Sequence, residues 1–180
     1  MTPIPTISTP RLTLRAPEAG DFPVFAAFFA SERSGFVGGP VPAEQSWRYL
    51  AAELGHWQLR GFGRWSVVET ATGKLAGLIG LWFPQGWPEP EIGWDLFDGF
   101  EGKGYATEAA LAAREYAYDT LGWTTAISLV APENAASRNV ARRMGARADG
   151  THEHERFGAL EIWRHPAPED LAAGGIEAYA

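Results

Sequence analysis

The residues of this chain that could do chemistry are concentrated in one glycine-rich stretch between Asp98 and Glu108. Gly99, Gly102 and Gly104 stand where a predicted strand gives way to a predicted helix. Glycines let backbone N–H groups approach an anion without a Cβ atom in the way, and a helix N-terminus adds a partial positive charge. The stretch therefore predicts a binding site for a phosphate or pyrophosphate group, the alternative being a tight turn that binds nothing.

Two familiar nucleotide-binding loops can be tested against this stretch, and neither fits. A Walker P-loop needs Ser or Thr after its Gly-Lys pair and another glycine five residues before the second one. Here Gly104 follows Lys103, and Phe97 occupies the position of the first glycine. A Rossmann fingerprint, GxGxxG, needs a third glycine where this chain has Thr107. Neither nucleotide loop is therefore expected.

Other reactive side chains are scarce, which narrows the chemistry. The chain has no cysteine, so disulfides, thiolate metal ligands and a cysteine nucleophile are excluded. No Gly-x-Ser-x-Gly nucleophile elbow is present. His152 and His154 share one face of a predicted strand, but a metal site needs a third ligand, so no metal is expected. A net charge of −7 disfavours a nucleic-acid partner and mildly favours a cationic one.

Strands and helices must position the glycine-rich stretch, and their signals are spread along the chain. Alternating and β-rich runs predict strands at 11–15, 63–69, 75–82, 91–97, 124–130, 147–155 and 158–164. Apolar residues three or four apart predict helices starting near 22 and 42, and helices over 106–121 and 135–144. Because strands occur both in runs and between helices, the sequence favours an α+β fold with a mixed sheet.

The clearest helical signal is a stripe of small residues in the predicted helix 106–121. Ala106, Ala109, Ala110 and Ala113 fall on one face at 3.6 residues per turn. Alanine side chains let a helix approach closely whatever it covers. The helix that follows the glycine-rich stretch is therefore expected to lie directly on another element.

Length and composition predict a single domain spanning 1–180. At roughly 100–200 residues per domain, 180 residues correspond to one compact unit. Residues 1–8 are expected to form an extended lead-in, and the Ala- and Gly-rich residues 166–180 a weakly ordered tail. No apolar run has the length of a membrane span, and the first residues lack a signal-peptide pattern. We therefore expect a cytoplasmic protein without a membrane partner.

Several motifs together give the chain a resemblance to a known family. Glu101-Gly-Lys-Gly-Tyr-Ala106 resembles the acyl-CoA motif Arg/Gln-x-x-Gly-x-Gly/Ala of the GNAT acetyltransferases, except that Glu101 replaces Arg or Gln. Four further segments are similar to the RimJ/RimL-like branch of that superfamily, and the likeness runs from about residue 9 to 165. They are Thr9-Pro-Arg-Leu12, Glu91-Ile-Gly-Trp94, Pro132-Glu-Asn-Ala-Ala-Ser137 and Val140-Ala-Arg-Arg-Met-Gly145.

The resemblance implies a three-layer α/β arrangement with helices on both faces of the sheet. The sheet would be mixed, mostly antiparallel, with six or seven strands, and splayed between the fourth and fifth strands. Acetyl-CoA, the implied cosubstrate, would lie in that cleft. Its pyrophosphate would meet the segment that comprises Glu101, Gly102, Lys103, Gly104, Tyr105, Ala106 and Thr107. Its pantetheine arm would contact the fourth strand, at Trp94, Asp95, Leu96 and Phe97. It would also contact the start of the predicted helix 135–144, at Asn134 and Ser137.

The implied reaction is direct transfer of an acetyl group to a primary amine, without a covalent acyl-enzyme. A peptide α-amine needs only about 1 kcal/mol for deprotonation at neutral pH, so a modest base suffices. Glu91 is the first candidate for that base, and Asp149 is the second. Family members often protonate the leaving thiolate with a Tyr, which is Ala141 here, so Ser137 is the candidate acid or ligand contact.

The acceptor stays open between a protein N-terminal α-amine and a small-molecule amine. Trp87 and Trp57 are the candidates for the walls of its pocket. The alternative function is a catalytically silent GNAT-like domain that binds CoA as a sensor or scaffold. We expect a monomer or a homodimer.

Overall fold

The structure, a computed structural model, describes residues 3–174, and its strands form one eight-stranded sheet. The strand order is β1-β2-β3-β4-β5-β6-β8-β7. All neighbouring strands are antiparallel except the pair β5 and β6. The strands are β1 (Ile7–Ser8), β2 (Leu12–Arg15), β3 (Arg64–Glu69), β4 (Leu75–Trp82), β5 (Glu91–Leu96), β6 (Ile127–Val130), β7 (Arg147–His154) and β8 (Gly158–Arg164).

The mixed, mostly antiparallel sheet confirms the predicted fold class, but the sheet has one strand more than the upper value of the predicted six or seven. The additional strand is β1, which lies within the predicted lead-in 1–8. It forms because Ile7 pairs with Leu14 and Ser8 with Thr13 in β2. Two residues are too few to show the alternation of apolar and polar side chains that predicts a strand, so β1 is recognised only by its pairing with β2.

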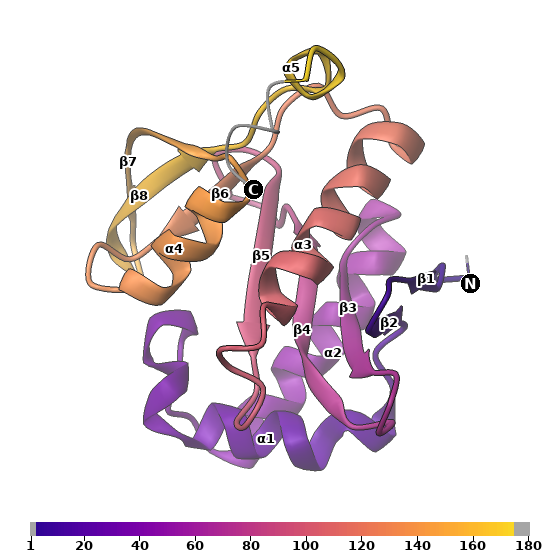
Figure 1. Cartoon of the computed structure of the whole chain (residues 1–180). Helices are drawn as coiled ribbons and strands as arrows, with labels where there is room; N and C mark the ends of the chain where they lie inside the picture. Colours follow the sequence, from indigo (N-terminus) through magenta and orange to yellow (C-terminus); the bar gives the residue numbers. More distant parts are fainter. Residues whose placement is uncertain (1–2, 175–180) are drawn as a thin grey trace.

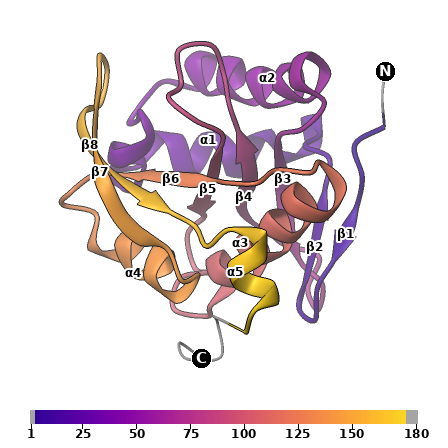
Figure 2. The same cartoon turned by 90° about the horizontal axis from the view of Figure 1, so that it is seen from above.

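Helices cover both faces of the sheet, as Figures 1 and 2 show. Helices α1 and α2 lie on one side, and α3, α4 and α5 lie on the other (Figure 2). The helices are α1 (Phe22–Ala30), α2 (Ala43–Arg60), α3 (Tyr105–Glu115), α4 (Ala135–Arg143) and α5 (Pro168–Ala172), with short 3₁₀ segments at Ala19–Asp21 and Glu32–Val37. No helix within residues 3–174 has the length and apolar character needed to cross a bilayer.

Helix α5 lies within residues 166–180, the predicted weakly ordered tail. Pro168 stands at the first helical position, where its fixed backbone angle suits a helix start. Leu171 packs against the main core, which gives this short helix a tertiary anchor. Residues 175–180 of the predicted tail lie outside the described residues.

The alanine stripe of α3 lies directly on the sheet. Ala109, Ala110 and Ala113 are completely buried, and α3 packs against β4 and β5. The predicted helix 106–121 ends earlier than expected, at Glu115, and continues as a π-helical turn over Tyr116–Thr120. Small side chains therefore set the close approach of α3 to the sheet, and with it the position of the glycine-rich turn that precedes the helix.

The sheet divides between β5 and β6. Only Glu91 and Ile127 are paired across these two parallel strands, and beyond that pair the strands separate. Figure 1 shows β6, β8 and β7 turning away from the rest of the sheet. β5 and β6 are the fourth and fifth strands of the sequence prediction, so the predicted splay is confirmed. We call the space between them the wedge.

A larger side chain in the alanine stripe should destabilise the fold. Ala113→Leu adds volume to a fully buried position between α3 and the sheet, and we expect it to lower the free energy of unfolding by about 1–3 kcal/mol. Ala51→Leu, on the exposed face of α2, is the matched control and should change stability by less than about 0.5 kcal/mol. Urea denaturation measures both values. Equal effects for the two variants would contradict the close packing of α3.

Candidate functional site

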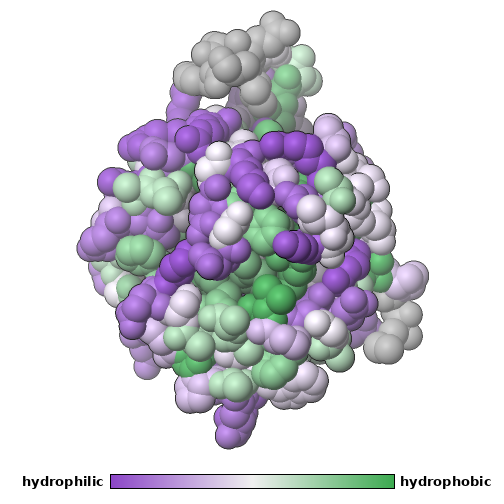
Figure 3. Space-filling view, turned by 60° about the horizontal axis from the view of Figure 1, so that its bottom comes forward, coloured by the Kyte–Doolittle hydropathy of each residue, from purple (hydrophilic) through white to green (hydrophobic). Residues whose placement is uncertain are grey.

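The wedge opens into a cavity of about 330 Å³. Its walls come from β5, β6, the start of α4, the β7–β8 hairpin, α2 and the segment before α2. In Figure 3, apolar side chains gather in a hollow on one face of the molecule, with hydrophilic residues around them. A concave, mostly apolar site with a few polar groups is the usual form of a small-molecule pocket.

Glu91 lies at the closed end of the wedge, where β5 and β6 make their single pair. Its side chain is 8% exposed and lines the cavity. One carboxylate oxygen accepts a hydrogen bond from the indole Nε1 of Trp87 at 2.6 Å, and the other accepts one from the Leu129 N–H at 3.1 Å. Burial raises the pKa of Glu91 to about 7, although both donors oppose the rise. A carboxylate with such a pKa can exchange a proton near neutral pH.

A buried charge cluster lies beside Glu91 in the cavity. The Arg64 guanidinium pairs with the carboxylates of Glu53 and Asp95, at 2.8 Å for Asp95. It also lies over the Trp82 ring, 5.0 Å from the ring centroid. Burial raises the pKa of Asp95, with Arg64 acting against the rise. Two carboxylates and one guanidinium give this cluster a net negative charge when all three groups are ionised.

Part of the cavity wall is aromatic. Trp87, whose indole holds Glu91, also packs edge-on against the His154 ring with centroids 5.1 Å apart. His154 in turn stacks near Phe157, at 4.8 Å. The prediction that Trp87 borders a pocket therefore agrees with its place on the cavity wall. His154, one of the two histidines on the predicted strand 147–155, lies on this wall too.

The open end of the wedge carries polar groups from the start of α4. Asn134 caps this helix, and its side chain accepts a hydrogen bond from the Ser137 N–H at 3.1 Å. Trp94 of β5 donates to the Ser137 hydroxyl across the wedge, at 3.2 Å. Since Ser137 accepts this bond, its own proton is free to be donated. Asn134, Ser137 and Trp94 all line the cavity, so three predicted contact residues meet there.

The glycine-rich turn follows the other end of β5 and leads into α3. Gly104 is the N-cap of α3. Its φ is +80°, a backbone conformation that residues other than glycine rarely adopt. Within residues 3–174, the backbone N–H groups from Gly102 to Thr107 make no hydrogen bond. The buried hydroxyl of Thr107 also has no partner in this part of the chain. Unpaired N–H groups and an unpaired hydroxyl at a helix start suit an anionic ligand.

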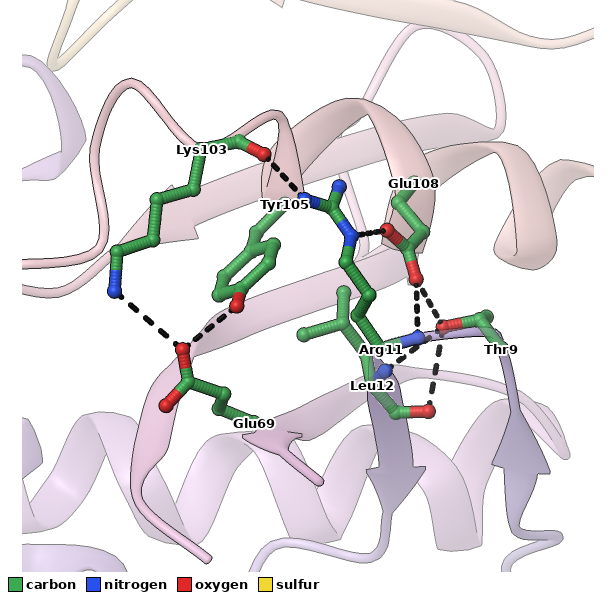
Figure 4. A network of polar contacts seen from close by, with 7 residues as sticks. All are labelled: Thr9, Arg11, Leu12, Glu69, Lys103, Tyr105 and Glu108. Atoms are coloured by element: carbon green, nitrogen blue, oxygen red, sulfur yellow. Dashed lines mark hydrogen bonds and ion pairs between the residues drawn. The ribbon is translucent and has the colours of Figure 1, made fainter. Parts of the chain in front are cut away.

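A network of polar contacts fastens this turn to the first strands (Figure 4). The carboxylate of Glu108 accepts hydrogen bonds from the Thr9 hydroxyl at 2.7 Å, from the Arg11 N–H at 2.9 Å and from the Arg11 Nε at 2.6 Å. Arg11 also donates to the carbonyl of Lys103 at 2.8 Å. On the other side, the Tyr105 hydroxyl donates to Glu69 at 2.6 Å. The turn is therefore held from the segment between β1 and β2 and from β3.

The remaining residues of the predicted phosphate site have structural partners. Glu101, which departs from the family motif, forms an ion pair with Arg33. Lys103 extends towards Glu69, with 3.4 Å between the charged atoms. Phe97 is buried in a second core cluster that contains Phe25 and Phe28, so only its backbone could face a ligand. Leu96 is partly buried, and its carbonyl accepts a bond from Arg33.

Two predicted site residues lie elsewhere. Asp149 on β7 is half exposed, forms an ion pair with Arg164 at 2.6 Å and does not line the cavity. Trp57 is a core residue instead of a pocket wall, because its ring packs against Trp65 and its Nε1 donates to the Arg64 carbonyl. Ala141, at the position of the family tyrosine, is completely buried behind the cavity wall. No hydroxyl can therefore act from position 141.

Comparison with known proteins identifies the family. A model of the acetyltransferase (GNAT) domain matches residues 11–147, which is most of the chain. The chain belongs to the GNAT acetyltransferase family. This confirms the resemblance drawn from the motifs. The glycine-rich turn, the splayed strands and the alanine-faced helix all lie within the matched range.

Solved structures of acetyltransferases share this fold. The acetyltransferase from Agrobacterium tumefaciens strain C58 is 38% identical, with 92% of this chain and 96% of that chain covered and a TM-score of 0.84. A ribosomal-protein-S5-alanine acetyltransferase from Vibrio fischeri is 14% identical over 92% of this chain and 98% of that chain, with a TM-score of 0.69, which shows a common fold.

A curated relative is the N-acetyltransferase YnaD of Bacillus subtilis, described as uncharacterized. It is 38% identical over 60 residues, which are 33% of this chain. The match spans 35% of the length of that relative.

Residues that the sequence analysis missed include Glu53, Arg64 and Arg156, all on the cavity wall. They come from α2, β3 and the β7–β8 turn, which are far apart in sequence. A lone charged residue in each element carries no spacing signal, so only the tertiary structure brings them together. Within residues 3–174, no group of three or more metal-ligating side chains has the arrangement of a metal site.

Glu91 should make stability depend on pH. Its pKa is about 7 in the fold against 4.5 for the free side chain, so between these pH values the folded chain holds a proton that the unfolded chain has lost. The contribution of Glu91 to the free energy of unfolding therefore falls as the pH rises through this window, by on the order of 3 kcal/mol. Urea unfolding at several pH values gives the free energy of unfolding of wild type and of Glu91→Gln. The difference between the two values, wild type minus variant, should decline as the pH rises.

The control for this measurement is Glu44→Gln on the exposed surface of α2. Its difference from wild type should stay level between about pH 5 and 8, because the Glu44 side chain is in contact with water in the folded and the unfolded chain alike. An equally level difference for Glu91→Gln would show that Glu91 has no raised pKa.

Proposed function

We propose that this protein transfers an acetyl group from acetyl-CoA directly to a primary amine, with Glu91 as the general base. The observation that carries the proposal is the buried Glu91 carboxylate, with a pKa of about 7, at the closed end of the wedge and on the cavity wall. General bases act best when their pKa lies near the working pH. Membership of the GNAT acetyltransferase family supports the reaction class.

The residues at the wedge and the glycine-rich turn fit acetyl-CoA. The unpaired N–H groups between Gly102 and Thr107, with the Thr107 hydroxyl, would hold the pyrophosphate. The edge of β5 beyond Glu91 is not paired with β6, so backbone groups near Trp94 can bond the amides of the pantetheine arm. Bound acetyl-CoA supplies an acetyl group that is already activated as a thioester.

Glu91 would take the proton from the acceptor amine, directly or through one water molecule. The hydrogen bonds from Trp87 and Leu129 fix its carboxylate in one orientation, which leaves each oxygen a further lone pair for the incoming proton. The neutral amine is then the nucleophile, so a covalent acyl-enzyme is not needed. This agrees with the absence of cysteine from the chain.

Ser137 would be the donor for the leaving thiolate or a contact to the pantetheine arm. Its hydroxyl already accepts a bond from Trp94, and its own proton is available to a third group. The competing function, a CoA-binding domain without activity, draws on the burial of Ala141 where family members often have a tyrosine. Release of free CoA in the presence of amines decides between the two functions.

Replacing the base should remove both rate and pH dependence. We expect Glu91→Gln to lower kcat with an amine acceptor about tenfold or more at neutral pH, the low end for loss of a general base. The rise of kcat/KM near pH 7 that belongs to Glu91 should disappear. Thiol release is measured against pH, with Glu44→Gln as a control that should keep the wild-type rate and profile. A wild-type rate in folded Glu91→Gln would assign proton removal to another group or to water.

A side chain at Gly104 should prevent CoA binding. Gly104→Val places a branched residue at φ of +80° in the turn and also obstructs the N–H groups. Gly122→Val is the matched control, because Gly122 has φ of +69° and open space around it but lies beyond α3, away from the turn. Calorimetric titration should show at least a tenfold loss of CoA affinity for Gly104→Val only. Equal affinities in the two folded variants would exclude the glycine-rich turn as the pyrophosphate site.

A further inference from the structure

The charges on the cavity wall are not all neutralised by one another. Within residues 3–174, two arginines line the cavity. Arg64 is paired with Glu53 and Asp95, whereas Arg156 has no carboxylate within ion-pairing distance among the described residues. Arg156, which is exposed to solvent, is therefore the cationic group of the wall that has no counter-ion among the described residues. A ligand of the cavity could supply one.

Arg156 is held in place by neutral groups. Its Nη2 atom donates to the Gly38 carbonyl at 2.7 Å and to the Tyr49 hydroxyl. The guanidinium carbon lies 5.6 Å from the centroid of the Tyr49 ring and 5.4 Å from that of Phe157. These contacts join the β7–β8 turn to the segment before α2. The side chain is thus oriented without being neutralised.

Gly38 is one of the residues that hold the Arg156 guanidinium. Its φ is +97°, and a Cβ atom at this position would lie 2.8 Å from the Arg156 Nη2. The close approach of the guanidinium to the backbone therefore requires glycine. Of the five N–H donors that a guanidinium carries, those on Nε and Nη1 make no hydrogen bond within the described residues. Both Nη2 hydrogens are used by Gly38 and Tyr49, so a carboxylate would be bound by a single charge-assisted hydrogen bond, from Nε or from Nη1.

The cavity wall therefore carries acidic groups on β5 and α2 and an arginine without a paired carboxylate on the β7–β8 turn. The acidic groups are Glu91 and the two carboxylates that pair with Arg64. The arginine is Arg156, and the indole of Trp87 and the ring of His154 lie between Glu91 and the β7–β8 turn. A diamine would meet an unpaired cation at Arg156. A ligand with an amine at one end, an apolar body and a carboxylate at the other matches the acidic groups, the aromatic rings and the arginine.

We propose that the acceptor is a small aminocarboxylate whose amine and carboxylate are separated by an apolar body. The amine lies at Glu91, and the carboxylate is bound by Arg156. The inference rests on the proposed function, because it names the acceptor of the same reaction. It does not follow from family membership, since it depends on one arginine, one glycine and the aromatic wall of this chain. Arg156 is here a specificity-determining residue that does not touch the reacting atoms.

The test compares two probes that differ only in charge, para-(aminomethyl)benzoate and its primary amide. Both carry the same amine and the same apolar ring. Dissociation constants are measured in the presence of CoA by tryptophan fluorescence, to which Trp82, Trp87 and Trp94 on the cavity wall contribute. Wild type should bind the acid about tenfold more tightly than the amide, a modest value for a hydrogen bond to a charged group.

Three variants show whether Arg156 causes this preference. Arg156→Gln should bind acid and amide equally and keep the wild-type affinity for the amide. Arg156→Lys keeps the positive charge but loses the planar donor set that Gly38 and Tyr49 orient, and it should retain part of the preference. Arg48→Gln removes an exposed arginine of α2 that does not line the cavity, and it should behave as wild type. The circular dichroism spectra of all variants check that they fold.

The proposal is overturned if wild type binds acid and amide equally, if neither probe binds, or if Arg156→Gln keeps the preference. Tighter binding of diaminobutane than of the acid would also overturn it. Thiol release, measured in parallel, separates the two levels of inference. Selective binding of the acid without any release of CoA would reject the proposed reaction and leave the carboxylate site standing. Turnover of acid and amide at equal kcat/KM would reject the carboxylate site and leave the reaction standing.

Discussion

Where β5 and β6 separate, side chains replace the backbone ladder of the sheet. The Ile127 N–H still bonds the Pro90 carbonyl at 3.1 Å, but beyond it the Leu129 N–H is satisfied by the Glu91 carboxylate. The Ser128 hydroxyl donates to the Ile92 carbonyl at 2.6 Å on the same seam. Buried backbone groups must find partners, so a sheet can open at this place only because these side chains supply them. The wedge and its acid are thus parts of one arrangement.

The need to satisfy the Leu129 N–H also explains the raised pKa of Glu91. A carboxylate that must reach the Leu129 N–H from the closed end of the wedge is withdrawn from water, and this raises its pKa to about 7. Arg64 is near enough to oppose the rise, but its charge is already engaged by Glu53 and Asp95. A free arginine at that position would hold Glu91 ionised and make it a weaker base. The buried cluster therefore keeps the positive charge away from Glu91.

One strand connects the two halves of the site. β5 begins with Glu91 in the wedge and ends where the chain enters the glycine-rich turn. The turn itself is held by the contacts of Glu108 with Arg11 and by the contact of Tyr105 with Glu69, so the segment before β2 and the strand β3 also determine its place. The alanine stripe lets α3 lie against β4 and β5. A ligand that spans turn and wedge would therefore meet groups held on a single rigid sheet.

The sequence by itself determined the features that depend on local order. The glycines before an alanine-faced helix predicted the turn and its N–H groups, and the ordered motifs predicted the family and the splayed sheet. Glu91 could be selected because it starts the strand that the family resemblance places beside the thioester. The raised pKa could not, since it follows from burial by residues distant in sequence. Only the tertiary structure shows that β1 pairs with β2 and that Trp57 packs in the core. It also shows that Asp149 forms an ion pair with Arg164 and that Arg156 lines the cavity. Each of these depends on contacts between elements far apart in the chain, for which a single sequence has no periodicity or spacing to read.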